Sequence, residues 1–311
     1  MSTATSELTD IIPTKWVAKR LRALRAFSFP MSILPVLISV AAVRHFTDWD
    51  IPILITSVLG AVLLHATGNL LNDYFDFRFA VDHKLDDDEG RPGRLLVRGE
   101  LKPCEILFEG LFCLVLVLPC AVFLVWKCGT PILIIGLIAA AAAYAYTGPP
   151  FHLKYRALGE PLIFLVFGLL PIIGAAYAQL GYFEWRVLLL AIPVGFPITA
   201  VVAANNLRDE AEDHAAGIRT LAQLADGRIA RVLYAVLIIL SPLSLVVLGI
   251  LGIGPYWLAI TPIALILIWR PLLTVLSRGR IPDIDAITAR YATILMLLTL
   301  IVLITHGGLT G

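Results

Sequence analysis

The sequence predicts an all-α, multi-pass membrane protein with nine transmembrane helices in one bundle. Of its residues, 59% are hydrophobic and only 15% are charged, and the mean hydropathy is +0.88. A soluble domain is about half apolar and a quarter charged. The apolar residues gather in runs of about 18–20, the length that crosses a bilayer as a helix. Since lipid offers no water to an open backbone, these runs must be helical.

The apolar runs divide the chain into nine segments, separated by polar connections. We find no linker to a second domain, so residues 1–311 are expected to form a single transmembrane domain. The last two segments are short for a membrane span. In chain order, the predicted spans cover 27–43, 51–71, 106–126, 131–146, 161–180, 187–204, 232–251, 253–269 and 287–305.

Basic residues are distributed unevenly between the two ends of the predicted bundle. The N-terminal region and the connections after the even-numbered segments hold 21 of the 24 Lys and Arg residues, and the other side has only Arg44, Lys127 and Arg186. The positive-inside rule therefore predicts a cytoplasmic N-terminus, with 1–26 as a polar, basic segment. We expect an integral protein of the cell inner or plasma membrane.

Two long polar connections, 72–105 and 205–231, share the predicted cytoplasmic side. Each begins with a cluster of Asn and Asp residues, so both are expected to be active-site loops. The formal net charge is only +1, and no base-reading motif is present, so nucleic acid is not an expected partner.

The first polar cluster follows the second apolar segment. Asn69, Asn72, Asp73 and Asp76 occupy positions i, i+3, i+4 and i+7, with Asp82 beyond them. On a helix the first four share one face. An Asp within a bilayer costs about 2.5–3.5 kcal/mol, and neighbouring carboxylates repel each other. A divalent cation would neutralise them, and Mg²⁺ combines carboxylates with phosphate oxygens and waters.

The second polar cluster repeats this pattern after the sixth apolar segment. Asn206, Asp209 and Asp213 lie at i, i+3 and i+7, with Arg208 between them. The alternative interpretation is ordinary polarity at a helix end. The repetition of amides and carboxylates at the same membrane face favours a shared site, where one or two Mg²⁺ ions and a diphosphate would lie between the clusters.

Cations and aromatic rings accompany the two clusters. Arg94 follows the first and Arg219 the second, and arginine suits bidentate contacts to phosphate. Between the clusters, a Gly-Pro turn is flanked by Tyr146, Lys154 and Tyr155. The rings would stabilise a carbocation through their π-faces, or belong to an interfacial aromatic belt. The lysine is a candidate phosphate or acceptor contact.

At these residues the chain resembles the UbiA-type intramembrane prenyltransferases. The patterns NxxNDxxDxxxxxD and NxRDxxxD match the two aspartate motifs of that family. The stretches NDYFDFRFAVD, YTGPPFHLKYRALGE and NNLRDEAEDHAAGIRTLA are most similar to 1,4-dihydroxy-2-naphthoate polyprenyltransferases of menaquinone biosynthesis. Two positions depart: Ala80 replaces a usual glycine, and Ile218 replaces a lysine usual in the naphthoate enzymes, which removes a cation near the diphosphate.

The resemblance implies a Mg²⁺-dependent enzyme that transfers a polyprenyl group from its diphosphate to an aromatic acceptor, with the tail in an apolar cleft open to lipid. It assigns catalysis to Asp73, Asp76, Asp209 and Asp213, and Mg²⁺ binding to these four with Asn72. Substrate contacts are expected from Asn69, Asp82, Arg94, Tyr146, Lys154, Tyr155, Asn206, Arg208 and Arg219.

Three alternatives differ from this interpretation. A related prenyltransferase would use another acceptor, such as a hydroxybenzoate, haem or a lipid alcohol. A membrane terpene cyclase of the same fold would quench the cation internally. A secondary transporter would place its ionisable residues near the middle of the membrane, whereas here the carboxylates cluster at one membrane face, which favours an enzyme.

Overall fold

The computed structural model describes residues 14–79, 95–215, 217–224, 227–277, 279, 281 and 283–310. These residues fold as helices joined by turns, and their only β-pairing is an isolated bridge between Arg156 and Arg219. The all-α prediction is confirmed.

Six helical elements are long and apolar enough to cross a membrane. One of them consists of three consecutive helical segments, of which the middle one is a π-helix. The spans are α3 (Ile51–Arg78), α4 (Pro103–Cys128), the run of α6 (Gly159–Ile163), η4 (Phe164–Leu169) and α7 (Leu170–Leu180), then α8 (Trp185–Arg208), α10 (Arg228–Ile250) and α12 (Ile284–His306).

The predicted number of nine spans is not confirmed. Helices occupy all nine predicted ranges, but two of the spans are helix pairs bent by 50° and 61°, so the described chain has six to eight spans by length and composition. The helix in the fourth range has 16 residues and extends about 24 Å, short of a hydrocarbon core of about 30 Å. The elements of the two bent pairs and of the fourth range are α1 (Thr14–Ala23), η1 (Ala26–Ser28), α2 (Pro30–Ala42), α5 (Thr130–Ala145), η6 (Tyr256–Leu267) and α11 (Trp269–Leu276).

The predicted active-site loops are partly helical. Helix α3 continues to Arg78 and α8 to Arg208, so the Asn and Asp residues of both motifs lie on or directly beside helix ends. The predicted polar segment 1–26 likewise contains α1. Short elements complete the polar connections: η3 (Leu153–Tyr155), α9 (Glu210–Ala215) and η5 (Leu221–Gln223).

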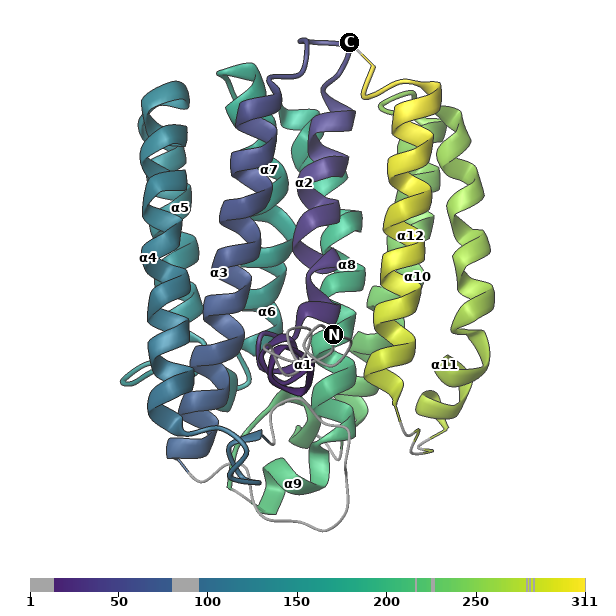
Figure 1. Ribbon diagram of the computed structural model, residues 1–311. Coiled ribbons are helices and arrows are strands. Elements are labelled where there is room, and N and C mark those ends of the chain that lie inside the picture. Colours follow the sequence, from purple (N-terminus) through teal and green to yellow (C-terminus); the bar gives the residue numbers. More distant parts are fainter. Residues whose placement is uncertain are drawn as a thin grey trace, which may run out of the picture.

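One end of the bundle gathers the polar connections. In Figure 1, α1, α9 and α11 lie toward the same end, and the C-terminal end of α12 lies at the other. This arrangement agrees with the alternation of the predicted spans, in which even-numbered connections share a side with the N-terminal region.

Close packing brings α8 against the interrupted helix α6–η4–α7. A Cβ on Gly168 would lie 2.7 Å from the Cα of Gly195, so only glycine permits this approach, as at many membrane helix interfaces. The rings of Phe164 and Phe196 stack beside the crossing. The main core, formed largely by α2, α8, α10 and α12, includes the fully buried Tyr234 and Tyr291.

Large apolar side chains cover the outside of the bundle. On α4 and α10, for example, Val122 is 69% exposed and Ile250 is 77% exposed. In water such surfaces would be costly, whereas lipid tails accept them. The chain is therefore an integral, multi-pass membrane protein.

Candidate active site

A cavity of about 250 Å³ is lined by residues of α2, α3, α5, α6, η4, α8 and α12. Both sequence motifs contribute to its wall, together with the turn that follows α5. Its polar lining comprises Arg25, Ser28, His65, Asn69, Asn72, Asp76, Tyr146, Lys154, Asn205, Asn206, Arg208, Asp209, Asp213 and Asp285.

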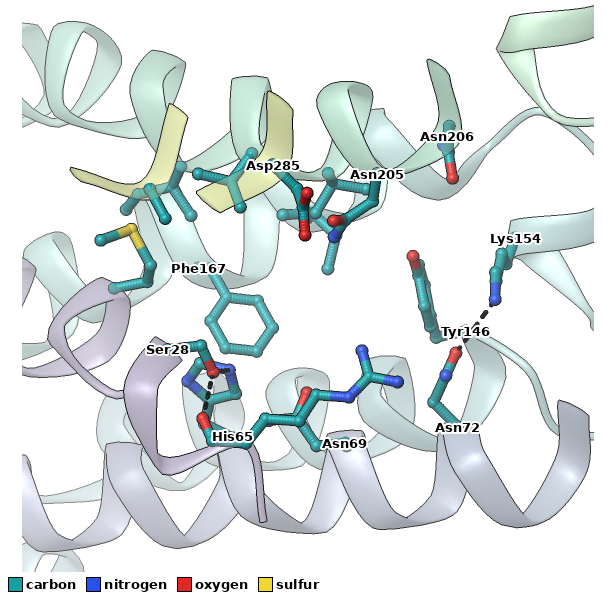
Figure 2. Close-up of a pocket in the computed structure, with 18 of the residues that line it drawn as sticks. Ser28, His65, Asn69, Asn72, Tyr146, Lys154, Phe167, Asn205, Asn206 and Asp285 are labelled. Atoms are coloured by element: carbon teal, nitrogen blue, oxygen red, sulfur yellow. Dashed lines mark hydrogen bonds between the residues drawn. The ribbon is translucent and has the colours of Figure 1, made fainter. Parts of the chain in front are cut away.

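The first motif presents a buried carboxylate that is already paired. Asp76 Oδ2 accepts from Lys154 Nζ at 2.7 Å and from Asn72 Nδ2 at 3.0 Å, and its Oδ1 accepts from the Tyr155 hydroxyl. Because a buried charge is tolerated only when it is paired and hydrogen-bonded, these contacts explain why Asp76 is only 4% exposed. Lys154 also lies 3.5 Å from Asn72 Oδ1, the contact drawn in Figure 2.

Asp73 is turned toward a different cation and does not line the cavity. Its carboxylate pairs with Arg25, which lies just before η1 with a left-handed backbone (φ 52°) and does line the cavity. The sequence analysis counted Arg25 only among the basic residues that orient the protein. Its role as the partner of a motif aspartate depends on the 50° bend between α1 and α2.

The second motif is held by its own arginine. Arg208 donates from Nε and Nη2 to the two oxygens of Asp209, both at 2.8 Å, and from Nη1 to Asp285. Asp285 lies in the first turn of α12, outside both motifs, and sequence reasoning missed it. The contact therefore fastens α8 to α12 at the cavity wall.

A buried glutamate orients the amide of the second motif. Asn206 Nδ2 donates to Glu160 Oε1 at 2.8 Å, and both side chains are buried. Among the described residues no hydrogen bond to the Asn206 oxygen is found, so this oxygen can serve a ligand of the cavity. In the sequence, Glu160 ends the stretch YTGPPFHLKYRALGE after the fourth predicted span. No spacing in the sequence links it to Asn206.

Two titratable groups outside the spans respond to this environment. Burial raises the pKa of Asp213 to about 6, and the nearby Asp209 and Asp76 add to the rise while Lys154 opposes it. Burial alone would lower the pKa of Lys154, but Asp76, Tyr146 and Asp213 outweigh it and hold that pKa above its ordinary value. The lysine is therefore a fixed cation, whereas Asp213 titrates near neutral pH.

The charges of the site fit a divalent cation. With every group ionised, the five aspartates in and beside the cavity wall outnumber its three cations by two. Among the described residues, no three His, Cys, Asp or Glu side chains are close enough to bind a metal by themselves. That suits Mg²⁺, which is usually held by one or two carboxylates together with substrate phosphates. The groups counted are Asp73, Asp76, Asp209, Asp213 and Asp285, with Arg25, Lys154 and Arg208.

The remaining predicted site residues divide into three groups. Asn69 and Tyr146 line the cavity, and Tyr155 reaches it through its hydrogen bond to Asp76. Arg219 is exposed and does not line the cavity, although its backbone bridges to Arg156. Asp82 and Arg94 lie outside the described residues, as does the Ala80 departure; Ile218 is buried.

Comparison with known proteins assigns the chain to a family. The model of the UbiA prenyltransferase family matches residues 32–301. The chain belongs to the UbiA prenyltransferase family. This membership makes it a transferase of prenyl groups, as the aspartate motifs predicted.

The chain matches about two thirds of the length of its curated relatives in this family. UbiA prenyltransferase domain-containing protein 1 of Xenopus tropicalis is 33% identical over 231 residues, which cover 73% of this chain and 65% of the relative. The Homo sapiens protein of that name is 33% identical, with 73% and 67% covered. These relatives do not carry the name of a dihydroxynaphthoate enzyme, so the predicted acceptor remains a proposal.

Solved structures share the fold of this UbiA-family chain. A UbiA homologue from Archaeoglobus fulgidus bound to GPP and Mg²⁺ superposes with a TM-score of 0.65 at 17% identity, covering 92% of this chain and 99% of that one. The apo structure of a homologue from Aeropyrum pernix K1 gives 0.66 at 18% identity, with 89% and 96% covered.

Proposed function

We propose that this UbiA-family protein transfers a polyprenyl group from its diphosphate to a hydroxylated aromatic acceptor, with 1,4-dihydroxy-2-naphthoate as the acceptor that the sequence favours. The observation that supports this most directly is the convergence of both aspartate motifs on one cavity, where Asp76, Asp209 and Asp213 meet Lys154 and Arg25. Such a set suits a diphosphate with a divalent ion.

One or two Mg²⁺ ions would lie between the motifs, each held by one or two of Asp76, Asp209 and Asp213 together with diphosphate oxygens, and the amide oxygens of Asn72 and Asn206 would assist. When bound, Mg²⁺ neutralises charge on the departing diphosphate. Related structures contain this ion with prenyl diphosphates. Asp73, which pairs with Arg25, would join them directly or through water.

In the proposed reaction, the bond between the allylic carbon and the diphosphate oxygen breaks and its electron pair leaves with the diphosphate. The aromatic carbon forms the new C–C bond, and the ring then loses a proton, or carbon dioxide where a carboxylate occupied that position. Lys154 and Arg25 lie in the wall, ready to stabilise the negative charge that develops on the leaving group. No reorganisation is required of Lys154 because Asp76 already fixes it.

The apolar part of the cavity suits the isoprenoid. Beyond the motif residues, the wall consists of side chains such as Phe27, Val166 and Val202. Phe27 is 65% exposed and borders the cavity, so a tail can continue toward lipid without crossing water. With the orientation given by the basic residues, we place the diphosphate end at the cytoplasmic side of the cell inner or plasma membrane.

The test is a transfer assay on the purified full chain. Farnesyl or geranylgeranyl diphosphate is incubated with Mg²⁺ and 1,4-dihydroxy-2-naphthoate, a hydroxybenzoate or a lipid alcohol, and the products are separated by mass. A prenylated aromatic product supports the proposal. A hydrocarbon formed without any acceptor would instead identify a cyclase, and unconsumed diphosphate under all conditions would refute transfer.

A further inference from the structure

The cavity wall also carries polar groups that lie outside both aspartate motifs, among them Ser28, His65 and Asp285. Figure 2 shows Ser28, His65 and Phe167 at the end of the cavity away from Lys154, and Asp285 beside Asn205 on the facing wall. The surrounding wall is apolar, with Met31 and Ile163 among its members. A few polar groups in an otherwise apolar wall are the usual device by which a pocket orients a small ligand.

The hydrogen bonds of Ser28 determine what it can offer to a ligand. Its hydroxyl donates to the Arg25 carbonyl at 2.7 Å, so in its 3.2 Å contact with His65 Nε2 the serine oxygen must accept. His65 is then protonated on Nε2, and its Nδ1 accepts from the Ser32 hydroxyl at 2.7 Å. Both imidazole nitrogens are satisfied, and one lone pair of Ser28 remains for the cavity.

Asp285 offers the same kind of group from the facing helix. Its Oδ2 accepts from Arg208, and among the described residues no hydrogen bond to Oδ1 is found. The side chain lines the cavity and is 21% exposed. A carboxylate only accepts hydrogen bonds, so Asp285 and Ser28 both require a ligand that donates.

We propose that Asp285 and Ser28 form the acceptor subsite of this enzyme and select an aromatic diol by accepting hydrogen bonds from its hydroxyl groups. The Phe167 ring provides an apolar contact for the ligand between them. This inference rests on the proposed transferase function and names the acceptor form: a dihydroxy aromatic binds, whereas the corresponding quinone or dimethyl ether brings only lone pairs toward two acceptors. A ligand that leaves these acceptors without a donor binds less tightly than one that pairs them.

An Asp285→Asn variant reverses the polarity of the subsite. Arg208 is a pure donor, so the amide oxygen of the new side chain must face it, which turns the amide nitrogen toward the cavity. The acceptor becomes a donor without a change in size. Asp283→Asn is the matched control, because Asp283 lies two residues away at the start of the same helix, is exposed and does not line the cavity.

The measurement compares binding of 1,4-dihydroxynaphthalene and its dimethyl ether, read from the rise in Tm of each purified full-length variant. Wild type and Asp283→Asn are expected to bind the diol about tenfold or more tightly than the ether, as for a hydrogen bond to a charged group. Asp285→Asn should lose or reverse this preference. A preference unchanged by Asp285→Asn would overturn the proposal.

Two further measurements separate the possible causes of a change. Because Asp285 also contacts Arg208, the KM for the prenyl diphosphate and the Mg²⁺ requirement are measured in the same variant; a change confined to these would overturn the subsite. Ser28→Ala should weaken diol binding without affecting them. If wild type binds the diol selectively but transfers no prenyl group, the proposed function fails while the subsite stands.

Discussion

The two aspartate motifs reach one cavity but are held in different ways. On α3, Asp76 is buried and bonded to Lys154 and Tyr155, which come from a distant part of the chain. At the end of α8, Asp209 is 28% exposed and pairs with the adjacent Arg208. The first motif is held by contacts to distant residues, whereas the second is more exposed and can exchange its partners when a ligand arrives.

The largest effects are expected from removing either motif carboxylate. Asp76→Ala and Asp209→Ala should each lower turnover by about 10³-fold, since each removes preorganised charge stabilisation. The comparison predicts a difference in stability. Asp76→Ala removes the carboxylate partner of the largely enclosed Lys154 and costs about 3 kcal/mol, whereas Asp209→Ala costs less than about 1 kcal/mol.

Diphosphate release and thermal unfolding in detergent measure these two effects. Asp48→Ala, an exposed aspartate between α2 and α3, is the control and should leave both unchanged. Equal destabilisation by the two motif variants would break the distinction between a fixed and an exchangeable motif.

Substitution of Lys154 tests whether the first motif acts through the lysine that is paired with Asp76. Lys154→Met keeps the length of the side chain and removes the charge, so we expect turnover to fall by about 10²-fold, as for loss of one electrostatic contact to developing charge. Lys154→Arg retains the charge and should recover part of the rate. Steady-state kinetics with varied prenyl diphosphate give the measurement, and a wild-type rate in Lys154→Met would remove the lysine from the mechanism.

The Mg²⁺ requirement should depend on pH through Asp213 of the second motif. Asp213 has a pKa of about 6, and its proton must leave before the carboxylate can bind a metal. The Mg²⁺ concentration for half-maximal activity should therefore rise about tenfold per pH unit below pH 6 and stay constant above it.

Protein stability should follow the opposite trend over the same range. Because the folded-state pKa of Asp213 lies above its ordinary 3.8, its contribution to stability falls as pH rises from about 4 to about 6. Magnesium titrations and unfolding curves across this range measure the two effects. If the Mg²⁺ requirement of Asp213→Asn no longer changes with pH, the assignment to Asp213 is confirmed. If the requirement of this variant still rises below pH 6, the assignment is contradicted.

The smallest effect is expected from Arg219. The sequence predicted a diphosphate contact, but its side chain is exposed and outside the cavity wall. Arg219→Ala should change the KM for prenyl diphosphate by less than about threefold, in line with a solvent-exposed charge. Binding assays with the diphosphate decide the point, and a loss of tenfold or more would show that the loop after α9 joins the second motif.

Local periodicity made much of the fold predictable. The apolar runs and the distribution of basic residues located the helices and the end at which the polar connections meet. The spacing of Asn72 and Asp76 placed both on one helix face, and Asn206 and Asp209 followed the same rule. The prolines inside the apolar runs predict kinks, but the two large bends, at residues 24–25 and 268, were not predicted, because the number of straight spans depends on where packing interrupts an apolar run.

By itself, the sequence determined the membrane class, the family and the two acidic helix faces, because these follow from composition and from spacing along single helices. Only the tertiary structure decided which charges meet. Arg25, Glu160 and Asp285 lie far from both motifs in sequence, and their contacts with Asp73, Asn206 and Arg208 arise from helix packing. No local pattern encodes them, since burial must bring a partner to each charge from whichever segment packs nearest.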